Sequence, residues 1–201
     1  MINKKLLAVV SLAAAVSTSA AFAKTEGNYA GVNLIRSATK SVYFDRSTTG
    51  SVKFEDNHKV GVGADYKYAI NFDGVFIAPG AFAEYNGARA KDVDGDQVKT
   101  KYRYGLKADI GYDLTDSFAI YFTNGLAATN YKTDWRYSGN GGKSSTELGY
   151  FYGAGLVYTL NKDLSINLEY NQQTVDYKTP DRTQKAETEL SVAKVGVSYH
   201  F

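Results

Sequence analysis

Most of this chain alternates, with a period of two, between apolar residues and small or charged ones. Successive side chains of a β-strand point to opposite faces, so this period predicts strands with one apolar face each. The pattern predicts eight antiparallel strands, at 29–36, 59–70, 75–86, 101–113, 118–128, 147–160, 164–170 and 190–201. In the last of them Leu190 and Val192 are out of step with the apolar face, which predicts a bulge or an early strand end there.

The connections between these strands alternate between short and long. Short, turn-like connections lie at 71–74, 114–116 and 161–163, and long polar ones lie at about 37–57, 87–99, 129–146 and 174–187. This layout is typical of an up-and-down transmembrane β-barrel with short periplasmic turns and long outer loops. It places both ends of the exported chain in the periplasm.

The N-terminal segment has the features of an export signal. Two lysines precede an apolar run at 6–16, and Ala21-Phe22-Ala23 matches a cleavage site. We therefore expect residues 1–23 to be a cleaved signal peptide and residues 24–201 to form one β-barrel domain. A membrane anchor is disfavoured because the run is short and small residues follow it. No later segment approaches the ~18 apolar residues of a membrane helix, so a membrane crossing requires a closed barrel.

Alternation alone does not distinguish a membrane barrel from a soluble, lipocalin-like barrel, which would hold its apolar face inside. The polar face here is mostly glycine and long charged residues, and glycine leaves room for long side chains to cross a narrow lumen. Tyrosines lie near both ends of the apolar bands, as at a membrane interface. These features favour an apolar face in lipid. At 118–128 both faces are apolar, and we assign Phe118, Ile120 and Phe122 to the outside.

The chain ends in the strand Val195-Gly196-Val197-Ser198-Tyr199-His200-Phe201, whose last residue is aromatic. With the export signal, this strand resembles the small outer-membrane β-barrel family, which includes OmpA-type transmembrane domains, OmpX and the Opa adhesins. The resemblance covers nearly the whole exported chain. It implies an all-β fold, an eight-stranded antiparallel up-and-down transmembrane β-barrel in the cell outer membrane. It also implies that the barrel-assembly machinery reads the terminal strand, through Val195, Val197, Tyr199 and Phe201.

The polar strand faces carry charged residues that the barrel would enclose. The expected lumen set is Lys59, Asp65, Lys67, Glu84, Lys101, Arg103, Lys107, Asp109, Glu147, Glu169 and Lys194. Charges removed from water need partners, and this set is nearly balanced, so we predict an internal salt-bridge network. An eight-stranded barrel is just wide enough for side chains to fill it. We therefore expect a plugged or very narrow lumen.

No residue pattern points to catalysis or to a cofactor. The chain has no cysteine and a formal net charge of +2, which excludes thiol chemistry and argues against nucleic-acid binding. Ser198 and His200 share a strand face but would lie at the periplasmic rim, far from outer-leaflet lipid. The run at 92–96 resembles part of a calcium loop, but its glycine comes one residue early and position twelve is Arg103. We predict no enzymatic activity, no cofactor and no metal site.

Function is expected to reside in the long loops, because loops on rigid barrels carry binding sites. The third loop offers candidate contacts for host or phage surface proteins, namely Trp135, Arg136 and Tyr137. In the alternative interpretation, Trp135 packs on a neighbouring loop or lies at the lipid interface. Basic side chains at the outer rim can pair with lipopolysaccharide phosphates. The first hypothesis is a monomeric, non-enzymatic surface protein with an envelope structural role, adhesion through its loops, or both. The alternatives are a narrow porin-like channel for small solutes or ions, and a lipid-modifying enzyme, for which the sequence offers no catalytic triad.

Overall fold

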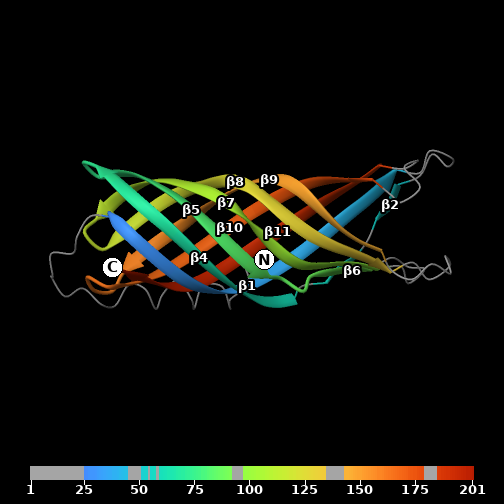
Figure 1. Ribbon diagram of the computed structural model, residues 1–201, viewed down its shortest axis with the longest axis horizontal. Coiled ribbons are helices and arrows are strands. Elements are labelled where there is room, and N and C mark those ends of the chain that lie inside the picture. The colour runs from blue at the N-terminus through green and yellow to red at the C-terminus, as the bar shows by residue number, and fades with distance from the viewer. Residues whose placement is uncertain are drawn as a thin grey trace, which may run out of the picture.

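The computed structural model describes residues 25–44, 51–53, 55–57, 59–91, 97–134, 143–178 and 185–201. Every regular element in these ranges is a β-strand (Figure 1), and none of the described residues belongs to a helix that could cross a membrane. The long strands are β1 (Gly27–Phe44), β4 (Lys59–Phe72), β5 (Val75–Tyr85), β7 (Gln97–Thr115), β8 (Phe118–Asp134), β9 (Lys143–Thr159), β10 (Leu164–Lys178) and β11 (Lys185–His200). The short strands are β2 (Ser51–Lys53), β3 (Glu55–Asn57) and β6 (Arg89–Lys91).

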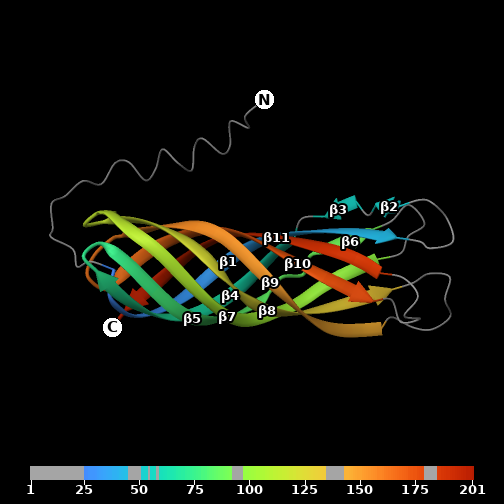
Figure 2. The same ribbon diagram turned by 90° about the horizontal axis from the view of Figure 1, so that it is seen from above.

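The eight long strands form a closed antiparallel ring. Each one pairs with the long strands that precede and follow it, and β1 closes the ring by pairing with β11 from Tyr29↔His200 to Phe44↔Lys185. The short β2 pairs with β1, while β3 and β6 extend the wall beside β7. Figures 1 and 2 show the strands tilted against the long axis of the barrel. The predicted eight-stranded up-and-down barrel is confirmed.

The barrel is apolar outside and polar inside. Large apolar side chains cover its outer surface, among them Val32 (67% exposed), Leu106 (70%) and Leu148 (68%). Charged side chains lie in the interior, where Arg103 and Asp109 have no exposed surface. A soluble barrel would show the reverse arrangement, so the outer band is the surface that faces lipid.

The short connections gather at one end of the barrel, which we call the turn end; the opposite end is the loop end. The turns lie at 73–74, 116–117 and 160–163. In the first turn Asp73 (φ 54°) and Gly74 (φ 97°) both have a left-handed backbone, as a two-residue type I′ hairpin requires. Asn71 Oδ1 accepts a hydrogen bond from Gly74 N at 2.9 Å. The chain also ends here, since Phe201 N donates to Asn28 O at 3.1 Å.

The strands extend farther toward the loop end than the sequence pattern predicts. β8 reaches Asp134 and β9 starts at Lys143, so most of the predicted loop at 129–146 is paired strand. The other three predicted loops are shortened in the same way. Beyond the lipid both faces of a strand can be polar, so the apolar alternation stops while backbone pairing continues. The predicted loop boundaries are wrong for this reason.

The register shifts among the described strand pairs occur in β7, not in β11. β11 pairs with both neighbours without a break, and Leu190 and Val192 point inward with no exposed surface. The bulge predicted there is wrong, because the inner face near the loop end is itself apolar. Between Thr100 and Arg103, in contrast, two residues of β7 oppose one of β8. This β-bulge changes which β7 side chains point outward.

Candidate functional site

Seven charged side chains form one chain of ion pairs inside the barrel. Cations and anions alternate along it in the order Lys67, Asp109, Lys107, Glu169, Lys194, Glu84 and Arg103. The nitrogen–oxygen distances of its six pairs run from 2.5 to 3.3 Å, and no side chain in it is more than 7% exposed. A buried charge without a partner is strongly destabilising, so each member of the chain compensates its neighbours.

Two of these ion pairs cross the lumen. Lys194 Nζ on β11 lies 2.5 Å from Glu84 Oε1 on β5, although β1 and β4 separate these strands in the ring. Lys107 Nζ on β7 lies 3.3 Å from Glu169 Oε2 on β10, with β8 and β9 between them in the ring. Side chains from separate walls therefore meet across the lumen.

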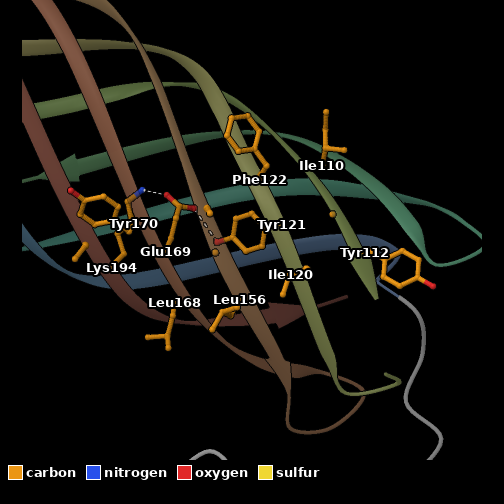
Figure 3. Close-up of a pocket in the computed structure, with 14 residues that line it drawn as sticks. Ile110, Tyr112, Ile120, Tyr121, Phe122, Leu156, Leu168, Glu169, Tyr170 and Lys194 are labelled. Atoms are coloured by element: carbon orange, nitrogen blue, oxygen red, sulfur yellow. Dashed lines mark hydrogen bonds and ion pairs between the residues drawn. The ribbon is translucent and has the colours of Figure 1, made fainter. Parts of the chain in front are cut away.

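A glycine gives room to the side chains around Glu169. Tyr121 on β8 is opposite Gly155 on β9, which is in turn opposite Glu169 on β10. A Cβ at Gly155 would collide with the ring of Tyr121. Because that Cβ is missing, the ring lies across β9 and its hydroxyl donates to Glu169 Oε2 at 3.1 Å. Figure 3 shows Tyr121 and Lys194 approaching Glu169 from two sides.

The other side of this wall is apolar. Ile110, Phe122 and Leu168 line a hollow on the outer surface, which Figure 3 shows beside the buried Glu169. Ile120 and Phe122 are 40% and 47% exposed, so their predicted outward direction is confirmed. The wall thus separates a charged interior from lipid by the thickness of one sheet.

Amide side chains extend the network beyond the charged residues. Gln173 Oε1 accepts hydrogen bonds from Arg103 Nε at 2.8 Å and from Thr129 Oγ1 at 2.9 Å. Gln173 Nε2 donates to a backbone carbonyl of β8 at 2.9 Å. Asn171 Nδ2 donates to Glu169 Oε1 at 2.7 Å. These bonds fix the orientation of the side chains that carry the ion pairs.

Aromatic rings pack against the cations, and apolar residues cover both ends of the chain of ion pairs. Arg103 Cζ lies 4.6 Å from the ring centroid of Phe151 and 4.9 Å from that of Phe82. Lys67 Nζ lies 5.0 Å from the ring centroid of Tyr121. Cation–π contacts of this kind are stronger where water is excluded. The apolar cluster toward the loop end is Ile35, Ala88, Leu190 and Val192. The one toward the turn end is Tyr29, Ala69, Phe76, Ala78, Ala119, Tyr121 and Val157.

The charged side chains of the interior are paired with one another and hold strands together. Each of the carboxylates Glu84, Asp109 and Glu169 contacts two cations, so none of them is held as a free general base. Within the described ranges, no group of three or more side chains is arranged to hold a metal ion. What the ion pairs do is connect five strands from the inside.

The remaining four residues of the predicted lumen set do not belong to the chain of ion pairs. Asp65 and Glu147 are half-buried, and Asp65 Oδ1 accepts a hydrogen bond from Asn33 Nδ2. Lys59 and Lys101 are exposed, so their assignment to the lumen is wrong. Lys59 is the first residue of β4, at the open rim of the loop end. The register shift in β7 turns Lys101 outward.

The terminal strand presents its apolar residues to lipid. The outward side chains are Val195, Val197, Tyr199 and Phe201, which are 45–62% exposed. The Phe201 ring is 6.2 Å from that of Tyr199 and 6.5 Å from that of Tyr66 on β4. On the inner face the ring of His200 stacks on that of Tyr29, with the ring centroids 4.7 Å apart.

Several predicted positions lie outside the described residues. They are Trp135, Arg136, Tyr137 and the run at 92–96. The uncharged members of the interior network, such as Gln173 and Tyr121, were not predicted from the sequence. Gln173 continues the inward parity of Glu169 beyond the predicted strand end at residue 170, and that parity is the signal that identifies it.

Comparison with protein families identifies the chain. The family described as "Outer membrane protein beta-barrel domain" matches residues 6–201. The chain belongs to this family. Membership agrees with the closed ring and the outward apolar band, and it places the protein in the cell outer membrane.

Two relatives illustrate the family. The 25 kDa outer-membrane immunogenic protein of Brucella canis is 29% identical over 178 residues, which cover 87% of this chain and 78% of the relative. The 22 kDa outer membrane protein of Rhizobium leguminosarum bv. viciae is 26% identical over 151 residues, which cover 73% of this chain and 69% of the relative.

Solved structures show the same fold. The outer membrane protein AlkL in DMPC bilayers has a TM-score of 0.56 and 16% identity, covering 92% of this chain and 94% of AlkL. OprG of Pseudomonas aeruginosa has a TM-score of 0.54 and 14% identity, covering 89% and 97%. Neisserial surface protein A has a TM-score of 0.52 and 16% identity, covering 88% and 100%. At these identities the similarity concerns the fold alone.

Proposed function

We propose that this protein is a non-enzymatic structural and display protein of the outer membrane, in which a closed barrel holds outer hairpins at the cell surface. The observation that carries the proposal is the buried contact of Lys194 with Glu84 across the lumen, at 2.5 Å. Barrels with an aqueous channel have about 16–18 strands, whereas side chains fill the interior of an eight-stranded one. A filled interior favours a role for the outer surface and the loops.

The length of the strands supports display. β8 and β9 stay paired from Phe118↔Tyr158 to Thr133↔Lys143, and each strand has 17 residues. A transmembrane β-strand needs only about 9–11 residues. Several residues of each strand therefore extend beyond the lipid as a stiff hairpin, directly before the candidate contacts Trp135, Arg136 and Tyr137 in the sequence. A preorganised support reduces the entropy lost when a loop binds a partner.

The names of related proteins agree with a surface role. The Brucella canis relative is called an immunogenic protein. Ail, the attachment invasion locus protein of Yersinia pestis, has a TM-score of 0.51 and 14% identity, covering 87% of this chain and 99% of Ail. Ail has been solved in complex with the heparin analogue sucrose octasulfate. We propose that the outer hairpins of this chain contact host or phage surface molecules.

Planar-bilayer conductance tests the closed barrel. Residues 24–201 are refolded, with the gel shift of the unboiled sample as the check on folding. We expect folded protein without steady conductance, because the ion pairs fill the lumen. Reproducible ion-selective steps would contradict a closed barrel.

Loop replacement tests display. The segment 135–142 is replaced by a Gly/Ser segment of equal length, and adhesion of expressing cells to host cells and to heparin-coated surfaces is measured. The matched control is the same replacement of 179–184, with cell-surface labelling to compare protein levels. Loss of adhesion in the first variant alone is the expected result. Adhesion that survives both replacements would exclude these loops as adhesive elements.

A narrow ion or solute channel is the second candidate. Within the described interior, Arg103 Nη2 and Asn171 Oδ1 are buried without a hydrogen-bond partner. Buried polar atoms of this kind are commonly satisfied by water, and water inside a charged lumen is a starting point for a thin pathway. Small conductance steps whose ion selectivity changes in Lys107→Gln would favour this candidate.

Three further expectations stay predictions. They are cleavage of the signal peptide after Ala23, recognition of the terminal strand by the barrel-assembly machinery, and a monomeric state. The proposed partners also include outer-membrane lipid and lipopolysaccharide.

A further inference from the structure

The residues just before and at the start of β1 are tied to a strand on another side of the ring. Thr25 donates two hydrogen bonds to the carboxylate of Asp113 on β7, from its N at 3.2 Å and from its Oγ1 at 2.6 Å. Asn71 Nδ2 on β4 donates to the same carboxylate at 2.7 Å and to Thr25 O at 3.3 Å. Hydrogen bonds to a charged acceptor are stronger than those between neutral groups. Thr25 is therefore held through its N, its Oγ1 and its O.

These bonds reach across the mouth of the barrel at the turn end. In the ring, β4 and β5 lie between β1 and β7, so Thr25 and Asp113 belong to separate parts of the wall. Asp113 is four residues beyond the buried Asp109 and therefore shares its inward direction. The chain bends at Gly27, whose φ of 95° lies in the left-handed region that glycine adopts without strain. The segment 25–28 thus leaves the wall and passes over the lumen.

The last strand packs against the same segment. Phe201 N donates to Asn28 O at 3.1 Å. The His200 ring occupies the space beside Gly27, where a Cβ would lie 2.6 Å from His200 Nε2. On its other side His200 Nδ1 is 3.1 Å from Lys162 O, in the turn between β9 and β10. The segment 25–28 therefore contacts β4, β7 and β11, which only the closed ring brings together.

An apolar cluster lies on the lumen side of this segment. Tyr29, two residues after Gly27, is 7% exposed and belongs to it. Ala69 is opposite Gly27 and Phe76 is opposite Asn71, and neither has any exposed surface. Apolar side chains at an open mouth would face water, which is unfavourable. The segment 25–28 is in the position of a cover over them.

We propose that residues 25–28 form a latch, anchored on Asp113, which closes the turn end of the lumen and locks the seam between β1 and β11. The latch needs Asp113 and His200 in their final positions, so it fastens only after the ring has closed. Contacts that form after the folding transition state slow unfolding and leave the folding rate nearly unchanged. The latch therefore keeps a closed barrel closed. This inference goes beyond surface display and does not depend on what the outer hairpins bind.

The first test is the unfolding rate in urea of residues 24–201 refolded in lipid vesicles, followed by the gel shift. Thr25→Ala and Asp113→Ala are each expected to unfold about tenfold faster, because hydrogen bonds to a charged group are lost. Refolding rates should stay within about twofold of wild type. Thr25 precedes the strands, so Thr25→Ala leaves the barrel wall intact. The matched control is Asp116→Ala, which removes an exposed carboxylate at the same end and should change neither rate.

The double variant Thr25→Ala/Asp113→Ala shows whether the two residues act through each other. It should unfold no faster than Asp113→Ala alone, because both substitutions remove the same two hydrogen bonds. Additive effects of the two substitutions would overturn the proposal. Slower refolding with an unchanged unfolding rate would also overturn it, because the contact would then form before the ring closes.

The second test asks whether the latch covers the lumen. The chain has no cysteine, so the single thiol of Ala69→Cys reports on access to the inner face of β4. Its reaction with a small charged methanethiosulfonate reagent is measured once the gel shift has confirmed folding. Adding Thr25→Ala is expected to raise the reaction rate about tenfold, because release of the latch opens the mouth. Adding Asp116→Ala is the control. Equal rates with and without Thr25→Ala would overturn the proposed closure.

Discussion

The ring of Tyr121 lies over Gly155, in the space that a side chain at residue 155 would occupy. This contact lets the Tyr121 hydroxyl reach Glu169 on the far side of β9. Glu169 in turn contacts Lys107 and Lys194, so one glycine gives access to the middle of the ion-pair chain. A glycine on the inner face therefore provides the space that a large neighbouring side chain occupies.

Gly155→Ala is expected to lower the free energy of unfolding by about 1–3 kcal/mol, because the added methyl group displaces the Tyr121 ring. The measurement is urea unfolding in lipid vesicles, followed by circular dichroism and the gel shift. Ala154→Val is the control, since residue 154 faces outward and should accept the larger side chain. Equal stability of Gly155→Ala and wild type would show that the Tyr121 contact with Glu169 is dispensable.

Glu84→Gln is expected to lower the free energy of unfolding by about 3–5 kcal/mol, because it leaves the buried Arg103 without a counter-ion and removes one of the two counter-ions of Lys194. Glu84 accepts Arg103 at 3.0 Å and Lys194 at 2.5 Å. The half-buried Glu147 lies outside the ion-pair chain, and Glu147→Gln is the matched control with an expected change below about 1 kcal/mol. Similar effects of the two substitutions would argue that the network does not brace the barrel.

Phe201→Ala is expected to reduce the amount of protein in the outer membrane severalfold, while protein refolded in vitro loses about 1 kcal/mol or less. Phe72→Ala is the control, because both rings face lipid near the turn end, with 62% of Phe201 and 59% of Phe72 exposed. The measurements are quantitative blotting of outer-membrane fractions and urea unfolding. If both variants reach the membrane at wild-type levels, the terminal aromatic is not an assembly signal.

The intact mass of protein isolated from outer membranes is expected to correspond to residues 24–201. The reason is the Ala21-Phe22-Ala23 pattern, in which small residues fit the cleavage site. Replacing Ala23 by Leu should leave the longer chain uncleaved. A mature mass that retains residues 1–23 would contradict the predicted domain boundary.

The residues that face lipid could be predicted because apolar residues recur with a period of two along each strand. Val60 and Val62 share a face in any straight strand, and that face had to be buried or placed in lipid. The same reasoning identified Glu84, Glu169 and Lys194 as interior residues. It failed where the period is broken or the surroundings change. Lys101 lies in the β7 bulge, where it and the next residue both face outward, so the alternation that correctly assigned Arg103 to the interior fails for Lys101.

Strand length and charge partners were not predictable in the same way. Beyond the lipid, polar residues occupy both faces of β8 and β9, so nothing in the pattern marks where pairing ends. Glu84 pairs with Lys194 on β11, which is 110 residues away from it in the sequence. Only the order and tilt of the strands around the ring bring such residues together.

The sequence by itself determined that this chain forms a lipid-facing barrel with charges inside, because alternation and the need to satisfy backbone hydrogen bonds in lipid allow little else. The tertiary structure decided which charges meet, which glycine admits Tyr121, and that the bulge in β7 turns Lys101 outward. These contacts depend on strand register and on the curvature of the closed ring. Both arise from pairing between segments far apart in the chain, which a local pattern does not contain.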